Sequence, residues 1–190
     1  MDPVSKKDLS AIRRRLGLYN MVPNLFWSVL NLVPISIYCY NQMDRMVLYI
    51  FGAIGLLHLF FPKSMIDTLQ IGDSVVIYRK LGVHLVNQVT QNGGIINKLI
   101  KKRFPAYKSV AFRPSSIHKL IGQTYALEKF HLALFVFYSL AMVYALVHQQ
   151  FGWAFIILVT NLIYNVYPNL LQQYIRLKLV VYRKKIQSVS

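Results

Sequence analysis

Long apolar stretches alternate with shorter polar ones along this chain. The four longest apolar stretches cover residues 22–40, 46–61, 129–147 and 151–171. Three of them match the length that an α-helix needs to cross about 30 Å of hydrocarbon, and the second is somewhat short. Because a helix satisfies its own backbone hydrogen bonds inside lipid, the pattern predicts an all-α integral membrane protein with four transmembrane helices.

The segment 62–127 between the second and third apolar stretches is polar and rich in Lys and Arg. Within it, apolar and basic residues alternate at helical spacing over residues 95–103. Such a helix has one apolar and one basic face, which is typical of helices that lie in the membrane interface. We therefore expect a basic loop that contains an interfacial amphipathic helix.

The distribution of charge predicts the orientation in the membrane. The chain has 190 residues, a formal net charge of +16 and a mean hydropathy of +0.40, so we expect one membrane domain over residues 1–190. Lys and Arg concentrate in the N-terminal segment, the 62–127 loop and the C-terminal tail, whereas the turns at 41–45 and 148–150 hold almost none. The positive-inside rule places these three basic regions, and so both termini, on the cytoplasmic side. Anionic lipid headgroups, rather than nucleic acid, are the expected partners of this charge.

Polar residues mark the ends of the third and fourth apolar stretches. Thr124, Glu128 and His131 are spaced four and three apart, so they share one face of a helix. A second polar stripe recurs every three or four residues along the last helix, at Asn161, Asn165, Asn169, either Gln172 or Gln173, and Arg176. Because the turn at 148–150 is short, we expect an antiparallel hairpin in which the two stripes face each other at one depth.

These residues suit the transfer of an acyl group to a hydroxyl. His131 is the candidate general base, and Glu128 is its candidate partner, fixing the imidazole tautomer or stabilising the imidazolium. Asparagine amides and an arginine could stabilise an oxyanion. The alternative is a non-enzymatic membrane scaffold, because such stripes also hold helices or subunits together by hydrogen bonds. A third reading is a lipid- or thiol-modifying four-helix enzyme that binds its cofactor at this depth.

No metal site is expected. The one cysteine, Cys39, excludes a Cys-based metal motif, and the sequence lacks His-Glu-x-x-His. Glu-x-x-His also occurs in di-iron helical bundles, but those need several carboxylates, and Glu128 is the one glutamate of the chain.

The ordered motifs resemble those of the glycosyl-4,4'-diaponeurosporenoate acyltransferase family, small bacterial membrane enzymes that esterify a carotenoid glucoside. The resemblance covers about residues 60–180. It is carried by Thr124-x-x-x-Glu128-x-x-His131, by Asn165-x-Tyr167-Pro168, by Gln172, Tyr174 and Arg176, and by the stretch Tyr78–Val89. The chain departs from the family pattern at Gln173, where the family usually has Arg, and at Ile175, where it usually has Asn.

The resemblance implies transfer of a fatty acyl group from acyl-CoA or acyl carrier protein, as a co-substrate, to a sugar hydroxyl of a lipid-linked acceptor. No resident cofactor is expected. The resemblance implies catalytic roles for His131 and Glu128 and substrate contacts from Thr124, Asn165, Asn169, Gln172, Tyr174 and Arg176. It places the protein in the bacterial cytoplasmic membrane, where we also expect a homo-oligomer because short helices bury little surface.

Overall fold

The computed structural model describes residues 6–90, 93–105 and 114–188, and every regular element in these ranges is a helix. The two N-terminal apolar helices are α1 (Lys6–Gln42) and α2 (Arg45–Leu57), and α2 ends in the 3₁₀ turn η1 (His58–Phe60). Four short helices follow: α3 (Lys63–Thr68), α4 (Val75–Lys80), α5 (Val83–Val89) and α6 (Gly94–Arg103). The last part is α7 (Pro114–Val147), α8 (Phe151–Asn161), the π-helical segment η2 (Leu162–Val166) and α9 (Tyr167–Gln187).

Among the described residues, three helical segments are long and apolar enough to cross a membrane: Ser10–Gln42, Ile117–Val147 and Phe151–Lys184. The apolar helix Arg45–Phe60 is shorter than these three. The prediction of an all-α protein is therefore confirmed for the described residues, and three of the four predicted spans have the length and composition to cross a membrane. The fourth predicted span, 46–61, forms a helix but does not reach the same length.

The helices extend beyond the apolar stretches that predicted them. The predicted loop 62–127 is largely helical where it is described, and its last part is the start of α7; its residues 91–92 and 106–113 lie outside the described residues. An apolar run marks where a helix meets lipid, whereas the helix itself continues for as long as the backbone can bond to the next turn. This difference explains why the pattern located the spans and misplaced their ends.

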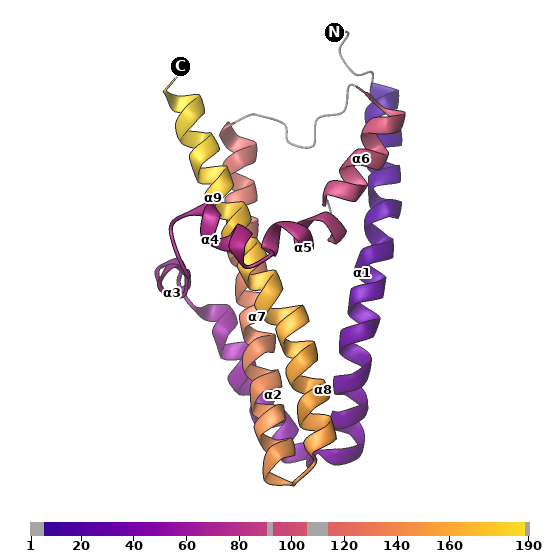
Figure 1. Ribbon diagram of the computed structural model, residues 1–190, viewed down its shortest axis with the longest axis vertical. Coiled ribbons are helices and arrows are strands. Elements are labelled where there is room, and N and C mark those ends of the chain that lie inside the picture. The colour runs from indigo at the N-terminus through magenta and orange to yellow at the C-terminus, as the bar shows by residue number, and fades with distance from the viewer. Residues whose placement is uncertain (1–5, 91–92, 106–113, 189–190) are drawn as a thin grey trace.

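The long helices form a hairpin with a third helix splayed beside it (Figure 1). α7 runs antiparallel to α8–η2–α9, and α2 packs on the outside of α7. A core at the turn end joins α1 to the hairpin through Ile35, Tyr38, Tyr138 and Ala141. At the other end α1 leans away and packs on α6 through Ile12, Ile96 and Ile100. The predicted amphipathic helix thus exists as α6, but part of its apolar face covers α1.

Hydrogen bonds tie the turn between α7 and α8 to the end of α1. Gln150 accepts a hydrogen bond from the Tyr38 hydroxyl at 3.0 Å and donates one to the Gln42 side chain at 2.9 Å. Asp44 caps α2 by accepting from the backbone N–H groups of Met46 and Val47. The ends of α1, α7 and α8 therefore lie at one level, which gives a reference from which depth along the bundle can be counted.

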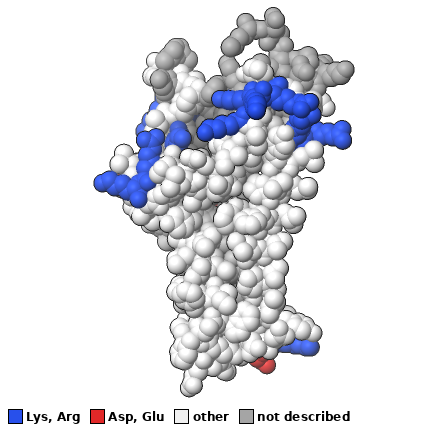
Figure 2. Space-filling model, turned by 45° about the vertical axis from the view of Figure 1, so that its right-hand side comes forward, with Lys and Arg blue, Asp and Glu red and all other residues white. Residues whose placement is uncertain are grey.

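Basic side chains gather at the opposite end. On the face shown in Figure 2, Lys and Arg crowd the end at which α6 and α9 finish, the middle of the bundle shows no charged side chain, and one basic and one acidic patch lie at the opposite end. The described ends of the chain, at the start of α1 and the finish of α9, lie at this same end (Figure 1). This arrangement agrees with the charge pattern that placed all three basic regions on one side.

Candidate functional site

The last long apolar segment, α8–η2–α9, is irregular at its centre. A π-helical turn spans Leu162–Val166, and Pro168 follows as the second residue of α9. Proline has no backbone N–H, so the carbonyl of Tyr164, four residues earlier, loses its normal helical partner. Single π turns in α-helices occur frequently at functional sites because they redirect side chains and free backbone groups. Here the irregularity lies directly opposite His131 on α7.

His131 and Asn165 form the centre of one polar group. The imidazole has the Asn165 side chain and the Tyr164 backbone as its polar neighbours, and it contacts the Tyr164 ring edge-on at 5.6 Å between centroids. Asn165 is fully buried and donates a hydrogen bond to Asn161 Oδ1 at 2.8 Å. Asn161 in turn donates to the Phe135 carbonyl and to Ser139 Oγ, both at 3.2 Å. The predicted facing of the two stripes is therefore found between α7 and α8–η2.

Several buried polar atoms in this group have no hydrogen-bond partner. They are His131 Nδ1, Asn165 Oδ1 and Asn169 Oδ1. Buried polar atoms are nearly always satisfied, so each exception needs an explanation, such as a bound ligand. An amide oxygen is a hydrogen-bond acceptor, and so is one nitrogen of a neutral imidazole. The group is therefore suited to a ligand that brings hydroxyl donors. We call His131, Asn165 and Asn169 the acceptor group.

Glu128 belongs to a second polar group, although it shares a helix face with His131. Its carboxylate pairs with the Arg176 guanidinium and accepts a hydrogen bond from Gln173 Nε2 at 2.6 Å. All three side chains are buried. No hydrogen bond joins Glu128 to His131 in the described part of the chain. The expected Glu128–His131 pair is thus replaced by a Glu128–Arg176 pair, because α9 presents a permanent cation and an amide at the height of the carboxylate.

Further contacts link this second group to the short helices. The Gln173 amide oxygen accepts from the Tyr78 hydroxyl at 2.9 Å, and its Nε2 donates to the Leu69 carbonyl at 3.3 Å. Arg176 donates to Gln70 Oε1 at 3.3 Å, and its guanidinium lies 4.2 Å from the centroid of the Tyr125 ring. Burial raises the pKa of the Tyr78 phenol, which keeps it a neutral donor. The network holds α3, α4, α7 and α9 together.

The other predicted substrate-binding residues lie near these groups in different roles. The buried Thr124 hydroxyl donates to the Ile121 carbonyl of its own helix at 2.7 Å. Tyr174 is buried in an apolar cluster, with its ring 6.5 Å from that of Tyr78. Gln172 is half-buried, one turn along α9 from Asn169. Thr124 and Tyr174 therefore stabilise the helices in this structure, whereas Gln172 lies beside the acceptor group.

No group of three or more His, Cys, Asp or Glu that could hold a metal was found among the residues that the structure describes. His131 has amides and an aromatic ring around it, and Glu128 is committed to Arg176. What the geometry offers is an imidazole beside open amide acceptors, at the middle of α7 in an apolar bundle. Such an arrangement can take a proton from a hydroxyl that the amides hold in place.

Comparison with protein families is decisive here. The model of the family described as glycosyl-4,4'-diaponeurosporenoate acyltransferase matches residues 62–185, which is well over half of the chain. The chain belongs to this acyltransferase family. No curated protein and no solved structure matched it. The matched region of the chain includes both polar groups, whereas α1 and α2 precede it.

Sequence reasoning missed the importance of Gln173, which appeared as a departure from the family pattern. The structure places it in the middle of the Glu128 network, where an arginine would add a second cation beside one carboxylate. Its spacing offered a signal, since Gln173 lies four residues after Asn169 and three before Arg176. Helical spacing alone could not decide between Gln172 and Gln173.

Proposed function

We propose that this protein transfers a fatty acyl group from a thioester donor to a sugar hydroxyl of a lipid-linked acceptor. Family membership supports acyl transfer, and the description of the family names a glycosylated acceptor. The observation that carries the proposal is the acceptor group, in which two buried amide oxygens and the Nδ1 of His131 lack a hydrogen-bond partner. A sugar brings several hydroxyl donors, so it satisfies these atoms in a way that an acyl chain does not.

In this mechanism His131 is the general base. The acceptor hydroxyl donates to the imidazole while Asn165 and Asn169 accept from neighbouring hydroxyls. The hydroxyl oxygen attacks the thioester carbonyl, and its proton moves to His131. The carbon–sulfur bond then breaks, and the departing thiolate takes the proton from the imidazolium. The products are an ester and a free thiol, and no residue of the protein is acylated.

Glu128 and Arg176 act as positioning residues in this account. Their pair fixes α9 against α7, and the π segment of the same continuous helix carries Asn165. Gln172 lies on the side of α9 from which an amide could donate to the oxyanion. The lysines of α6, which lie at the basic end of the bundle, attract the phosphates of acyl-CoA or acyl carrier protein.

We further propose that the site lies at the cytoplasmic leaflet of a bacterial inner membrane, with both termini cytoplasmic and with α2–η1 as a fourth crossing. The positive-inside rule and the gathering of Lys and Arg at one end support this orientation (Figure 2). Anionic membrane lipids bind the same basic end. A homo-oligomer would cover part of the outward apolar surface, and cross-linking in native membranes would detect it.

The test is a reaction of purified protein in liposomes with palmitoyl-CoA and a glycosylated lipid, followed by mass spectrometry. The proposal predicts an acceptor that is heavier by one acyl group, together with one equivalent of free thiol. A scaffold, for which the ion-paired network between helices is the supporting observation, predicts neither product. Absence of product with acyl-CoA and with acyl carrier protein donors would refute the transferase. Radiolabelled palmitoyl-CoA given without acceptor should leave the protein unlabelled, and a stable acyl-protein would contradict direct transfer.

A further inference from the structure

A second set of unsatisfied polar atoms lies on α1, outside the acceptor group. Asn31 is 3% exposed, and neither its Nδ2 nor its Oδ1 has a hydrogen-bond partner. The neighbouring Tyr138 hydroxyl donates to the backbone carbonyl of Asn31 at 3.2 Å, and its oxygen can accept from one N–H of the Asn31 amide, which leaves the second N–H and Oδ1 without a partner. An amide buried among apolar helices with an N–H and its oxygen left open is costly unless a ligand completes it.

Asn31 lines a groove of ≈ 220 Å³ between α1 and the last long apolar segment. The other lining residues are almost all apolar: Trp27, Leu30, Pro34, Val159, Thr160, Ile163 and Tyr164. Thr160 directs its hydroxyl back to the Ile156 carbonyl of its own helix at 2.9 Å. Asn31 therefore places an open, buried polar group in a mostly apolar groove, which suits a long apolar ligand with a polar position.

The groove and the acceptor group share a wall. Tyr164 lines the groove and also contacts the His131 ring. A ligand in the groove is therefore separated from the proposed base by one side chain.

Depth along the helices relates the two places. Counted from the turn end at 1.5 Å per residue, Asn31 lies about 16 Å deep, Tyr164 about 20 Å and His131 about 24 Å. Asn31 is thus about 8 Å further from the basic end than His131.

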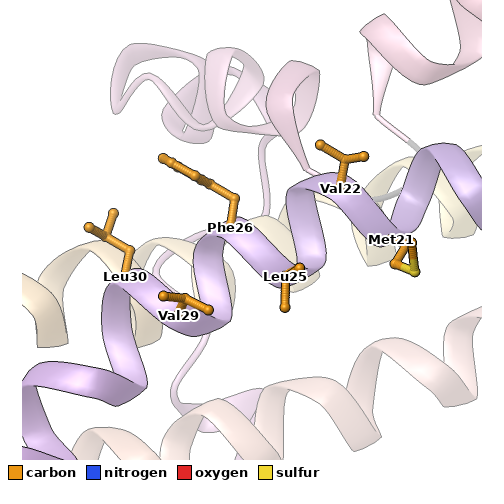
Figure 3. A pocket seen from close by; sticks show the side chains of 6 residues that line it. All are labelled: Met21, Val22, Leu25, Phe26, Val29 and Leu30. Carbon is orange, nitrogen blue, oxygen red and sulfur yellow. The ribbon is translucent and has the colours of Figure 1, made fainter.

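A hollow on the outer face of α1 adjoins the groove. It measures ≈ 420 Å³ and is lined by Met21, Val22, Leu25, Phe26, Val29 and Leu30, all from α1 (Figure 3). Leu30 lines both the hollow and the groove. Side chains of one helix that project outward contact lipid in a bilayer, so the hollow shows that the groove has an apolar approach. It is not a site by itself.

We propose that the groove binds the apolar tail of the glycosylated acceptor and that the Asn31 amide hydrogen-bonds to the linkage between the sugar and the tail. The inference rests on the proposed function. The polar group of an acyl donor is its thioester carbonyl, which the reaction places at His131. A polar position about 8 Å deeper lies beyond the far side of a sugar ring whose hydroxyl reacts at His131, where the linkage to the tail begins. An acceptor whose sugar lies at the acceptor group and whose tail runs past Pro34 and Val159 fits both places.

The test compares Asn31→Leu with Asn24→Leu in the transfer assay. Asn24 is an exposed asparagine two turns away on the same helix, so the control has the same chemistry outside the groove. Asn31→Leu is expected to raise the KM for the glycosylated acceptor about tenfold, because the ligand linkage loses its hydrogen bond. The KM for palmitoyl-CoA should stay within twofold. Equal acceptor KM values in Asn31→Leu and Asn24→Leu would overturn the inference and leave the transferase standing.

A second measurement does not need turnover. A glycosylated lipid with a diazirine in its tail is photolysed with the protein, and labelled peptides are mapped by mass spectrometry. Label is expected on residues of the groove from α1 and η2, and Val159→Phe, which narrows the groove, should reduce it several-fold. Label spread evenly over the outer faces of α1, α2 and α8 would overturn the inference. If the protein transfers no acyl group but the groove is labelled, the proposed function fails and the lipid site remains.

Discussion

Substituting either partner of the Glu128–Arg176 ion pair tests whether this pair stabilises the bundle. Both side chains are almost fully buried, at 3% and 4% exposed, and they contact each other directly. Breaking a buried ion pair by removing one partner typically costs about 3–5 kcal/mol, because the other charge remains buried. Glu128→Leu is expected to reach this range, since a guanidinium cannot lose its charge. Arg176→Met is expected to cost less, because a carboxyl left alone can take up a proton.

The partial pairing of Arg176 with Asp67 sets the size of the effect. Asp67 lies 3.8 Å from the guanidinium, but its side chain is 51% exposed, so its attraction is screened by water. Asp67 cannot replace the buried Glu128 carboxylate, but its weak attraction reduces the penalty for the remaining guanidinium. The expected loss in free energy of unfolding for Glu128→Leu is therefore at the lower end of the range, about 3 kcal/mol. The double variant Glu128→Leu/Arg176→Met removes both charges together and should lose clearly less than the sum of the two single variants.

The assay is reversible unfolding in mixed micelles with increasing SDS, followed by circular dichroism, for wild type, both single variants and the double variant. The result is a coupling free energy from the cycle, expected to be at least about 2 kcal/mol. Additive losses would refute the argument, because they would mean that the two charges do not depend on each other. A loss below about 1 kcal/mol in Glu128→Leu would mean that water reaches the pair and screens it.

Three further predictions concern packing, hydrogen bonding and orientation. A Cβ on Gly55 would lie 2.8 Å from the Ala133 carbonyl oxygen, whereas one on Gly52 meets nothing within 4 Å. In SDS unfolding, Gly55→Ala should therefore destabilise the protein, and Gly52→Ala should stabilise it by up to about 1 kcal/mol; equal effects would contradict the close approach of α2 and α7. Tyr78→Phe should cost about 1–3 kcal/mol because Gln173 loses a donor. Because burial raises the pKa of the Tyr78 phenol, its contribution to the free energy of unfolding is complete below about pH 10 and declines as the pH rises above this value. Tyr78→Phe should weaken that decline. In a Cys39→Ser background, an impermeant maleimide should label Met46→Cys in intact cells and Arg183→Cys after lysis alone; the reverse pattern would refute the orientation.

Much of the fold could be predicted because membrane helices carry a strong pattern. Apolar runs located the hairpin and the first helix, and the lack of charge at 148–150 identified the tight turn. The pattern could not give the helix ends or the arrangement of α3 to α6. Those depend on packing against α1 and α9, which a local window of sequence does not contain.

The site was half predictable for a similar reason. Helical spacing correctly brought His131 opposite Asn165, because the hairpin sets the register of both helices. It could not show that Glu128 turns to Arg176 and Gln173, since spacing defines a shared face and not the direction of a side chain. The π turn before Pro168 was also hidden. The turn depends on how the neighbouring helices accommodate the carbonyl that Pro168 leaves without a helical partner, and the local sequence does not show this.

His131→Ala tests the central claim most directly, with His148→Ala as its control. His148 lies in the turn directly after α7, is exposed and contacts the Tyr144 ring. The substitution His148→Ala therefore removes an imidazole without changing the site. Both variants are purified, checked for wild-type unfolding behaviour and given palmitoyl-CoA with the glycosylated lipid in liposomes. The account predicts that His131→Ala loses at least about a hundredfold in turnover, as expected for a missing general base, while His148→Ala keeps the wild-type rate. A folded His131→Ala protein that esterifies the acceptor at the wild-type rate would contradict it.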